Sequence, residues 1–144
     1  MTLRMESLPV RRGPAVLRGL AVTGVVGLGF AAAAGTYLLT WAARAYCDAG
    51  FEPAGRFEMN MLALPLTGAS VLLAVVSWAG ARAATRRMAI GWRGALPASV
   101  VVGSLLLLGW AYFAVVGTMD SYHGDSGLCP ASNIPPWWPS FLPA

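Results

Sequence analysis

The order of apolar and charged positions divides the chain into three long uncharged runs separated by short charged segments. The charged residues that bound these runs are Arg18 and Arg44, Glu58 and Arg82, and Arg93 and Asp120. Each run has roughly 23–26 residues, enough for a helix at 1.5 Å per residue to cross about 30 Å of hydrocarbon. A backbone in hydrocarbon must satisfy its own polar groups, which a helix does within one segment. The pattern therefore predicts three transmembrane helices.

Composition agrees with this pattern. The 144 residues are 57% hydrophobic and only 11% charged, whereas a soluble domain has about 25% charged residues. The alternation typical of a membrane β-barrel is absent, so we expect an all-α membrane protein with three transmembrane helices in a small bundle. The net charge is +4 and all basic residues are arginines. Most of them flank the apolar runs instead of forming one stripe, so no nucleic acid is expected as a partner.

The distribution of arginines predicts the orientation. Eight of the ten lie before the first run or between the second and third, namely Arg4, Arg11, Arg12, Arg18, Arg82, Arg86, Arg87 and Arg93. Because cytoplasmic loops are enriched in basic residues, the N-terminus is expected inside and the C-terminus outside. A cleaved signal peptide is the competing interpretation of the first run. The apolar stretch continues through Trp41, which favours an uncleaved span.

These observations divide the chain into seven segments and place it in a bacterial cytoplasmic membrane. The segments are a cytoplasmic basic N-terminus (1–18), a first helix (19–43), an outer loop (44–58), a second helix (59–81), a cytoplasmic Arg-rich loop (82–95), a third helix (96–119) and an outer Pro- and Trp-rich tail (120–144). Tryptophans prefer the headgroup layer, so Trp92, Trp137 and Trp138 are predicted to anchor the chain at the membrane interface. For the tail, docking to a partner protein is the alternative.

A stripe of small residues marks one face of the first helix. Gly27, Ala31 and Gly35 recur every four residues, a spacing that places them on the same face. Small residues let two helices in a membrane approach closely and gain dispersion contacts. The stripe is therefore a predicted packing seam for a neighbouring helix.

Two cysteines, Cys47 and Cys129, fall on the same predicted outer side. An extracytoplasmic compartment is oxidising, and an even number of cysteines there indicates a disulfide. We therefore predict a Cys47–Cys129 bond that ties the tail to the first outer loop. Free thiols and an interchain bond remain the alternatives.

The single histidine lies among acidic residues just after the third run. Asp120, His123 and Asp125 form a candidate polar site for a divalent metal or for catalysis. Zinc sites usually have three or four protein ligands, often with further His or Cys. A hydrated stretch that ends the helix is the simpler interpretation, so no metal, cofactor or catalytic residue is assigned.

The function that fits these features is that of a small non-enzymatic membrane component, a subunit, anchor or accessory factor of a larger assembly. Its expected partners are membrane lipid and either another protein or further copies of itself, bound through the helices. An oligomeric transporter or channel subunit is the first alternative, although no buried acid, base or histidine marks a proton path in the runs. A membrane enzyme with an outer site near His123 is the second.

Overall fold

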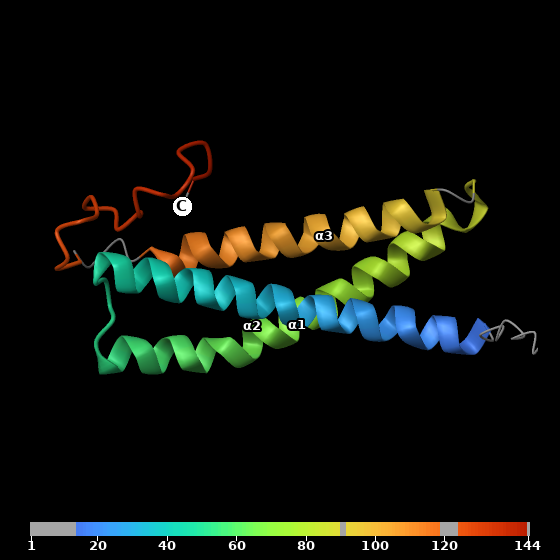
Figure 1. The fold of residues 1–144 in the computed structure, drawn as a ribbon, viewed down its shortest axis with the longest axis horizontal. Helices are drawn as coiled ribbons and strands as arrows, with labels where there is room; N and C mark the ends of the chain where they lie inside the picture. Colours follow the sequence, from blue (N-terminus) through green and yellow to red (C-terminus); the bar gives the residue numbers. More distant parts are fainter. Residues whose placement is uncertain (1–13, 90–91, 119–123, 144) are drawn as a thin grey trace, which may run out of the picture.

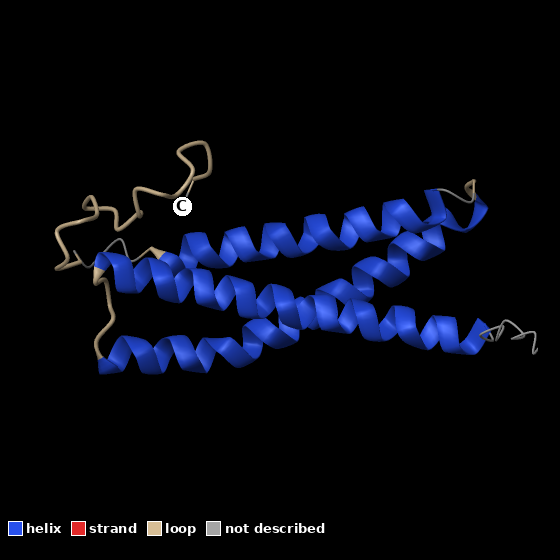
Figure 2. Cartoon of the chain, viewed as in Figure 1, coloured by secondary structure: helices blue, strands red, loops and turns tan. Residues whose placement is uncertain are grey.

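The computed structural model describes residues 14–89, 92–118 and 124–143, and this part of the chain contains helices, turns and an extended tail but no strand (Figure 2). The elements are α1 (Pro14–Cys47), α2 (Pro53–Ala84), the short 3₁₀ helix η1 (Thr85–Arg87), α3 (Trp92–Tyr112) and the π-helix η2 (Phe113–Gly117). Three stretches are long and apolar enough to cross a membrane, namely Gly19–Cys47, Pro53–Arg87 and Gly94–Gly117. The predicted all-helical architecture with three long apolar helices is confirmed.

The three helices form an elongated bundle in which α1 and α3 run in the same direction and α2 runs in the opposite direction (Figure 1). Cys47 ends α1 at one end of the bundle, where the tail also begins; we call this the disulfide end. The turn at η1 joins α2 to α3 at the opposite end, which we call the arginine end after Arg82, Arg86 and Arg87. The tail turns back beside α3 (Figure 1).

Small side chains allow the helices to pack closely at the centre of the bundle. Val25 of α1, Ala74 of α2, and Val101 and Leu105 of α3 form the buried apolar cluster. The hydroxyl of Ser77 on α2 donates a hydrogen bond to the hydroxyl of Ser104 on α3 at 3.2 Å. These contacts hold the middle of α2 against both α1 and α3.

Gly29 marks the closest approach of α1 to α2. An ideal Cβ at this position would lie 2.8 Å from the Cα of Val71 and 3.1 Å from the carbonyl oxygen of Ser70. Only glycine lacks a Cβ, so no other residue permits the two backbones to approach this closely. Ser70 is itself buried at this crossing.

The helices extend beyond the uncharged runs at both sides of the first connection. α1 continues past Arg44 to Cys47, and α2 begins at Pro53, a residue whose fixed φ suits the first turn of a helix. The connection thus shrinks to residues 48–52, where Asp48 and Gly50 both have positive φ. A charged residue ends the stretch that can lie in hydrocarbon, but the backbone hydrogen bonds of the helix continue past it.

α2 contains Pro65, which cannot donate a backbone hydrogen bond within the helix. The helix continues through this residue but is visibly bent along its length (Figure 1). The bent helix meets α1 near the middle of the bundle, where Val71 lies against Gly29, and lies beside the start of α3 at the arginine end.

The outer surface of the bundle is apolar on every helix. Leu38 of α1 is 62% exposed, Leu64 of α2 is 77% exposed and Leu106 of α3 is 69% exposed. Soluble monomers rarely expose large contiguous apolar surfaces, and a helix that is hydrophobic all round suits a buried or membrane environment. The apolar exterior therefore needs an apolar solvent or a partner.

Candidate functional site

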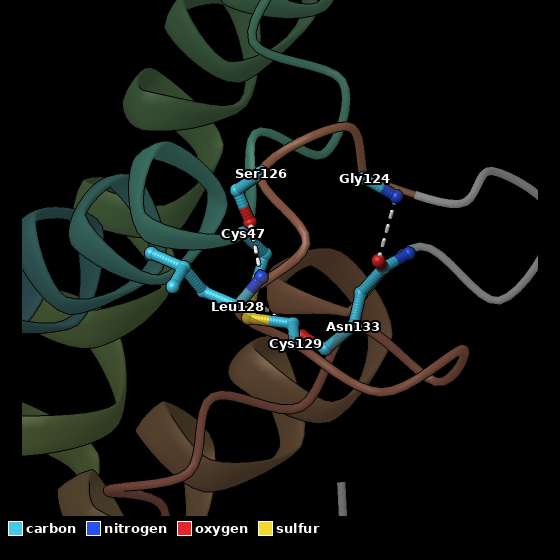
Figure 3. The surroundings of a disulfide bond; sticks show 6 residues. All are labelled: Cys47, Gly124, Ser126, Leu128, Cys129 and Asn133. Atoms are coloured by element: carbon cyan, nitrogen blue, oxygen red, sulfur yellow. Dashed lines mark hydrogen bonds between the residues drawn. A yellow bond between two sulfur atoms is a disulfide. The ribbon is translucent and has the colours of Figure 1, made fainter.

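At the disulfide end, a disulfide bond joins the tail to the end of α1. Cys47 and Cys129 are bonded, with their Cα atoms 5.4 Å apart and 82 positions apart in sequence (Figure 3). Cys47 is the last residue of α1 and is fully buried. The predicted pairing is present, and it joins the tail to the end of the first helix.

The loop of residues 124–133, which contains Cys129, is held at its two ends by Gly124 and Asn133. The side-chain oxygen of Asn133 accepts a hydrogen bond from the backbone N–H of Gly124 at 3.0 Å (Figure 3). Asn133 is buried and has a positive φ, which asparagine tolerates better than most residues. A Cβ on Gly124 would overlap the carbonyl oxygen of Cys47, so the close approach of the tail to α1 requires glycine there.

Beyond the disulfide, aromatic residues fasten the tail to the end of α3. The Trp138 ring stacks on Phe113 of η2, with ring centroids 4.0 Å apart and an interplanar angle of 16°. The indole N–H of Trp110 donates to the carbonyl oxygen of Pro143 at 2.7 Å. The tail is thus attached at three points, by the disulfide, by the stacked rings and by the Trp110 hydrogen bond.

An apolar groove of about 740 Å³ lies between α1, α3 and this tail. Its α1 wall spans Ala32 to Leu39, and its α3 wall spans Gly103 to Trp110. Trp138 and Leu142 of the tail form its third side. With Thr36 as its one polar side chain besides the indoles, the groove suits an apolar occupant.

A seam of polar side chains lies between α1 and the end of α3. Thr36, Thr40 and Arg44 are four residues apart and so share one face of α1. The hydroxyl of Thr36 lies 2.8 Å from where a Cβ on Gly109 would be, and Arg44 Nε donates to the carbonyl oxygen of Val116 at 2.8 Å. The face of α1 that carries these residues therefore packs on α3 and η2.

Three buried polar atoms in this seam have no hydrogen-bond partner: Thr40 Oγ1, Arg44 Nη1 and the Tyr112 hydroxyl oxygen. A buried donor without a partner costs about 1–3 kcal/mol. All three atoms are shielded from the surface of the bundle. The seam therefore contributes to helix packing at an energetic cost.

The predicted small-residue stripe makes no close contact with another helix of the chain, although Gly35 at its end also lines the groove. A Cβ on Gly27 or Gly35 would meet no heavy atom within 4 Å, and Ala31 is exposed. The close contact with α2 uses Gly29 instead. The stripe is thus free of contacts within the chain, and its use by another helix stays a prediction.

The predicted interface tryptophans lie at both ends of the bundle. Trp92, at the start of α3 and the arginine end, is 60% exposed, and Trp137 in the tail is 45% exposed. Trp138 is half-buried against Phe113, and its indole N–H donates to the carbonyl oxygen of Leu142 at 2.9 Å. Trp138 therefore holds the tail, whereas Trp92 and Trp137 are free to contact an interface.

Of the candidate polar site, Asp120 and His123 lie outside the described residues, and Asp125 is exposed in the turn before Cys129. Among residues 14–89, 92–118 and 124–143, no group of three or more His, Cys, Asp or Glu side chains is arranged to hold a metal ion. The described part of the chain therefore adds no ligand set to the one that the sequence indicates.

Sequence reasoning missed the burial of Arg44. It treated Arg44 as a charge outside the first span, whereas the side chain is only 3% exposed and packs against η2. The signal that could have revealed it is the spacing of Thr36, Thr40 and Arg44, which continues a polar face to the end of the helix. The contacts of Trp110 and Phe113 with the tail had no local signal.

Comparison with protein-family models, with curated proteins and with solved structures gives no match for this chain.

Proposed function

We propose that this protein is a small non-enzymatic component of a membrane assembly, a subunit, anchor or accessory factor that binds a partner's transmembrane helix through α1. The observation that carries the proposal is the open stripe of Gly27, Ala31 and Gly35. These residues share one face, and a Cβ added at either glycine would meet no atom of another helix within 4 Å. Because lipid tails are as apolar as leucine, helices in a membrane associate by close packing, which small residues permit.

The proposed orientation has the arginine end in the cytoplasm and the disulfide end outside. Arg82, Arg86 and Arg87 are all exposed at the arginine end, as expected for a cytoplasmic loop. The Cys47–Cys129 bond lies at the opposite end, and disulfides persist in oxidising compartments outside the cytoplasm. Charge and redox chemistry thus independently support the same orientation in a cell membrane.

The test is the size and composition of the complex extracted in mild detergent. The variant with Gly27→Leu and Gly35→Leu adds two bulky side chains to the stripe, at positions where a Cβ meets no heavy atom within 4 Å. It is expected to fold, insert and migrate as a smaller species than the wild type. Mass spectrometry of the wild-type complex is expected to show one foreign membrane protein in fixed stoichiometry, absent from the variant.

The matched control places leucine at Gly68 and Gly80 of α2, two further positions where a Cβ meets nothing within 4 Å. This variant should leave the complex unchanged, because it adds the same volume away from α1. A complex that survives the α1 substitutions, or one that contains only copies of this chain, would overturn the proposal.

A further inference from the structure

The groove between α1, α3 and the tail differs from the rest of the apolar surface because it has three walls. α1 supplies Gly35 and Leu39, α3 supplies Gly103 and Gly109, and the tail supplies Leu142. Glycines on both helices leave the volume of about 740 Å³ between them. We propose that this groove binds one hydrocarbon chain of a membrane lipid and retains it beside the tethered tail; the inference rests on the membrane location proposed above.

The length of the groove argues against a partner helix as its occupant. The α3 wall extends from Gly103 to Trp110, which at 1.5 Å per residue is about 10 Å, a third of the roughly 30 Å hydrocarbon layer. A transmembrane helix with side chains is about 10–12 Å wide and must continue to both surfaces. Toward the disulfide end it would have to pass Trp138 and Leu142, which line the groove where Trp138 stacks on Phe113.

A lipid chain has neither constraint. It is flexible and narrower than a helix, and it ends within the bilayer. The lining of the groove is almost wholly apolar, and an acyl chain needs no hydrogen bond, whereas a polar ligand would leave its donors and acceptors unpaired there. The chain of a lipid in the leaflet on the disulfide side therefore matches both the position and the chemistry of the groove.

The tail turns an open surface depression into a retaining site. Trp138 is stacked on Phe113, Trp110 binds the carbonyl of Pro143, and the disulfide fixes the start of the tail to α1. These attachments hold Leu142 at the groove. Without them α1 and α3 would still be covered by bilayer lipid, but the third wall would be lost and lipid would exchange as it does on α2.

The experiment uses a phospholipid with a photoreactive group in one acyl chain, reconstituted with the oxidised full-length protein in liposomes. After irradiation, peptide mapping locates the attached lipid. Labelling of the α3 segment 103–110 and of Leu142 is expected to exceed by several-fold the labelling of Leu64, Leu72 and Val76. Those α2 residues are highly exposed apolar positions outside the groove.

Two perturbations should lower groove labelling to the α2 level. Gly103→Leu fills the groove from its α3 wall, where a Cβ meets no atom within 4 Å. Reduction of the Cys47–Cys129 bond removes the covalent attachment of the tail and leaves the third wall of the groove held only by the Trp138 stack and the Trp110 hydrogen bond. The matched control, Gly68→Leu, adds the same side chain to an exposed α2 position outside the groove and should leave labelling unchanged.

Equal labelling of the groove and α2 in the wild type would overturn the lipid site while leaving the membrane location intact. A groove occupied by a second copy, seen as a crosslinked dimer in place of lipid attachment, would overturn it as well. Absence of label on all three helices would instead contradict the membrane location itself. Gly35 lies in both the stripe and the groove, whereas Gly103 lies only in the groove and Gly27 only in the stripe. Gly103→Leu alone therefore measures loss of lipid, and Gly27→Leu alone measures loss of a protein partner.

Discussion

Two glycines on α1, Gly27 and Gly29, provide a direct test of the helix packing. Replacing either by alanine adds one methyl group and improves helix propensity by about 1 kcal/mol. At Gly27 the new Cβ meets nothing within 4 Å, whereas at Gly29 it would lie 2.8 Å from the Cα of Val71. Because the propensity gain is common to both variants, the difference between them isolates the cost of separating α1 from α2.

That cost follows from the atoms involved. The neighbours of a Cβ at Gly29 are backbone atoms of Ser70 and Val71, which cannot rotate away as the tip of a side chain can. Overpacking of this kind costs about 1–3 kcal/mol. We therefore expect Gly27→Ala to be as stable as the wild type or up to about 1 kcal/mol more stable, and Gly29→Ala to be about 1–3 kcal/mol less stable than Gly27→Ala.

The assay is unfolding of the purified protein in mixed micelles, followed by circular dichroism as the fraction of denaturing detergent increases. Wild type, Gly27→Ala and Gly29→Ala are compared under the same conditions, with the disulfide intact in all three. Unfolding midpoints that shift equally for the two variants would refute the α1–α2 crossing at Gly29. A larger loss of stability at Gly27 would show that the stripe, not Gly29, packs within the chain.

Three further predictions concern the disulfide, the orientation and one interhelical hydrogen bond. Protein purified without reductant should contain no thiol that can be alkylated after denaturation, and two reactive thiols would contradict the bond. Cys129→Ser should lower the free energy of unfolding by less than the roughly 4.5 kcal/mol that chain entropy gives for an 82-residue separation. The loss is smaller because inserted helices already restrict the unfolded chain. A reporter that is active only in the cytoplasm should be silent when fused after Ala144, and an active fusion would refute the proposed orientation. A double-mutant cycle with Ser77→Ala and Ser104→Ala should give a coupling of about 0.6 kcal/mol, and zero coupling would remove the hydrogen bond seen at 3.2 Å.

The three helices could be predicted from sequence because each apolar run is long enough to cross a bilayer. Their ends could not, since helix formation depends on backbone hydrogen bonding as well as on polarity. Arg44 and Glu58 end the uncharged runs, yet both residues lie inside helices that continue to Cys47 and begin at Pro53. Hydropathy indicates the apolar layer, whereas capping and turn residues such as Asp48 and Gly50 set the connection.

The faces of the helices were harder to predict. Gly27 and Gly29 are two residues apart on one helix, and both are small. The sequence alone does not distinguish the glycine that meets α2 from the glycine that faces outward, because that choice depends on the crossing geometry of two helices. The disulfide was predictable because the sequence has only two cysteines and both fall on the same predicted outer side, whereas the groove depends on how the tail folds back.

The disulfide also closes part of the chain into a covalent ring. Cys47 closes onto Cys129 across 82 positions, so all of α2 and α3 lie within a single covalent ring that α1 leaves at its last residue. A protease that cuts once inside this ring, for example in the connection at residues 48–52 or in η1, opens the ring without dividing the molecule. The nicked protein therefore keeps its full mass under denaturing conditions and separates into two fragments only when a thiol reductant is added.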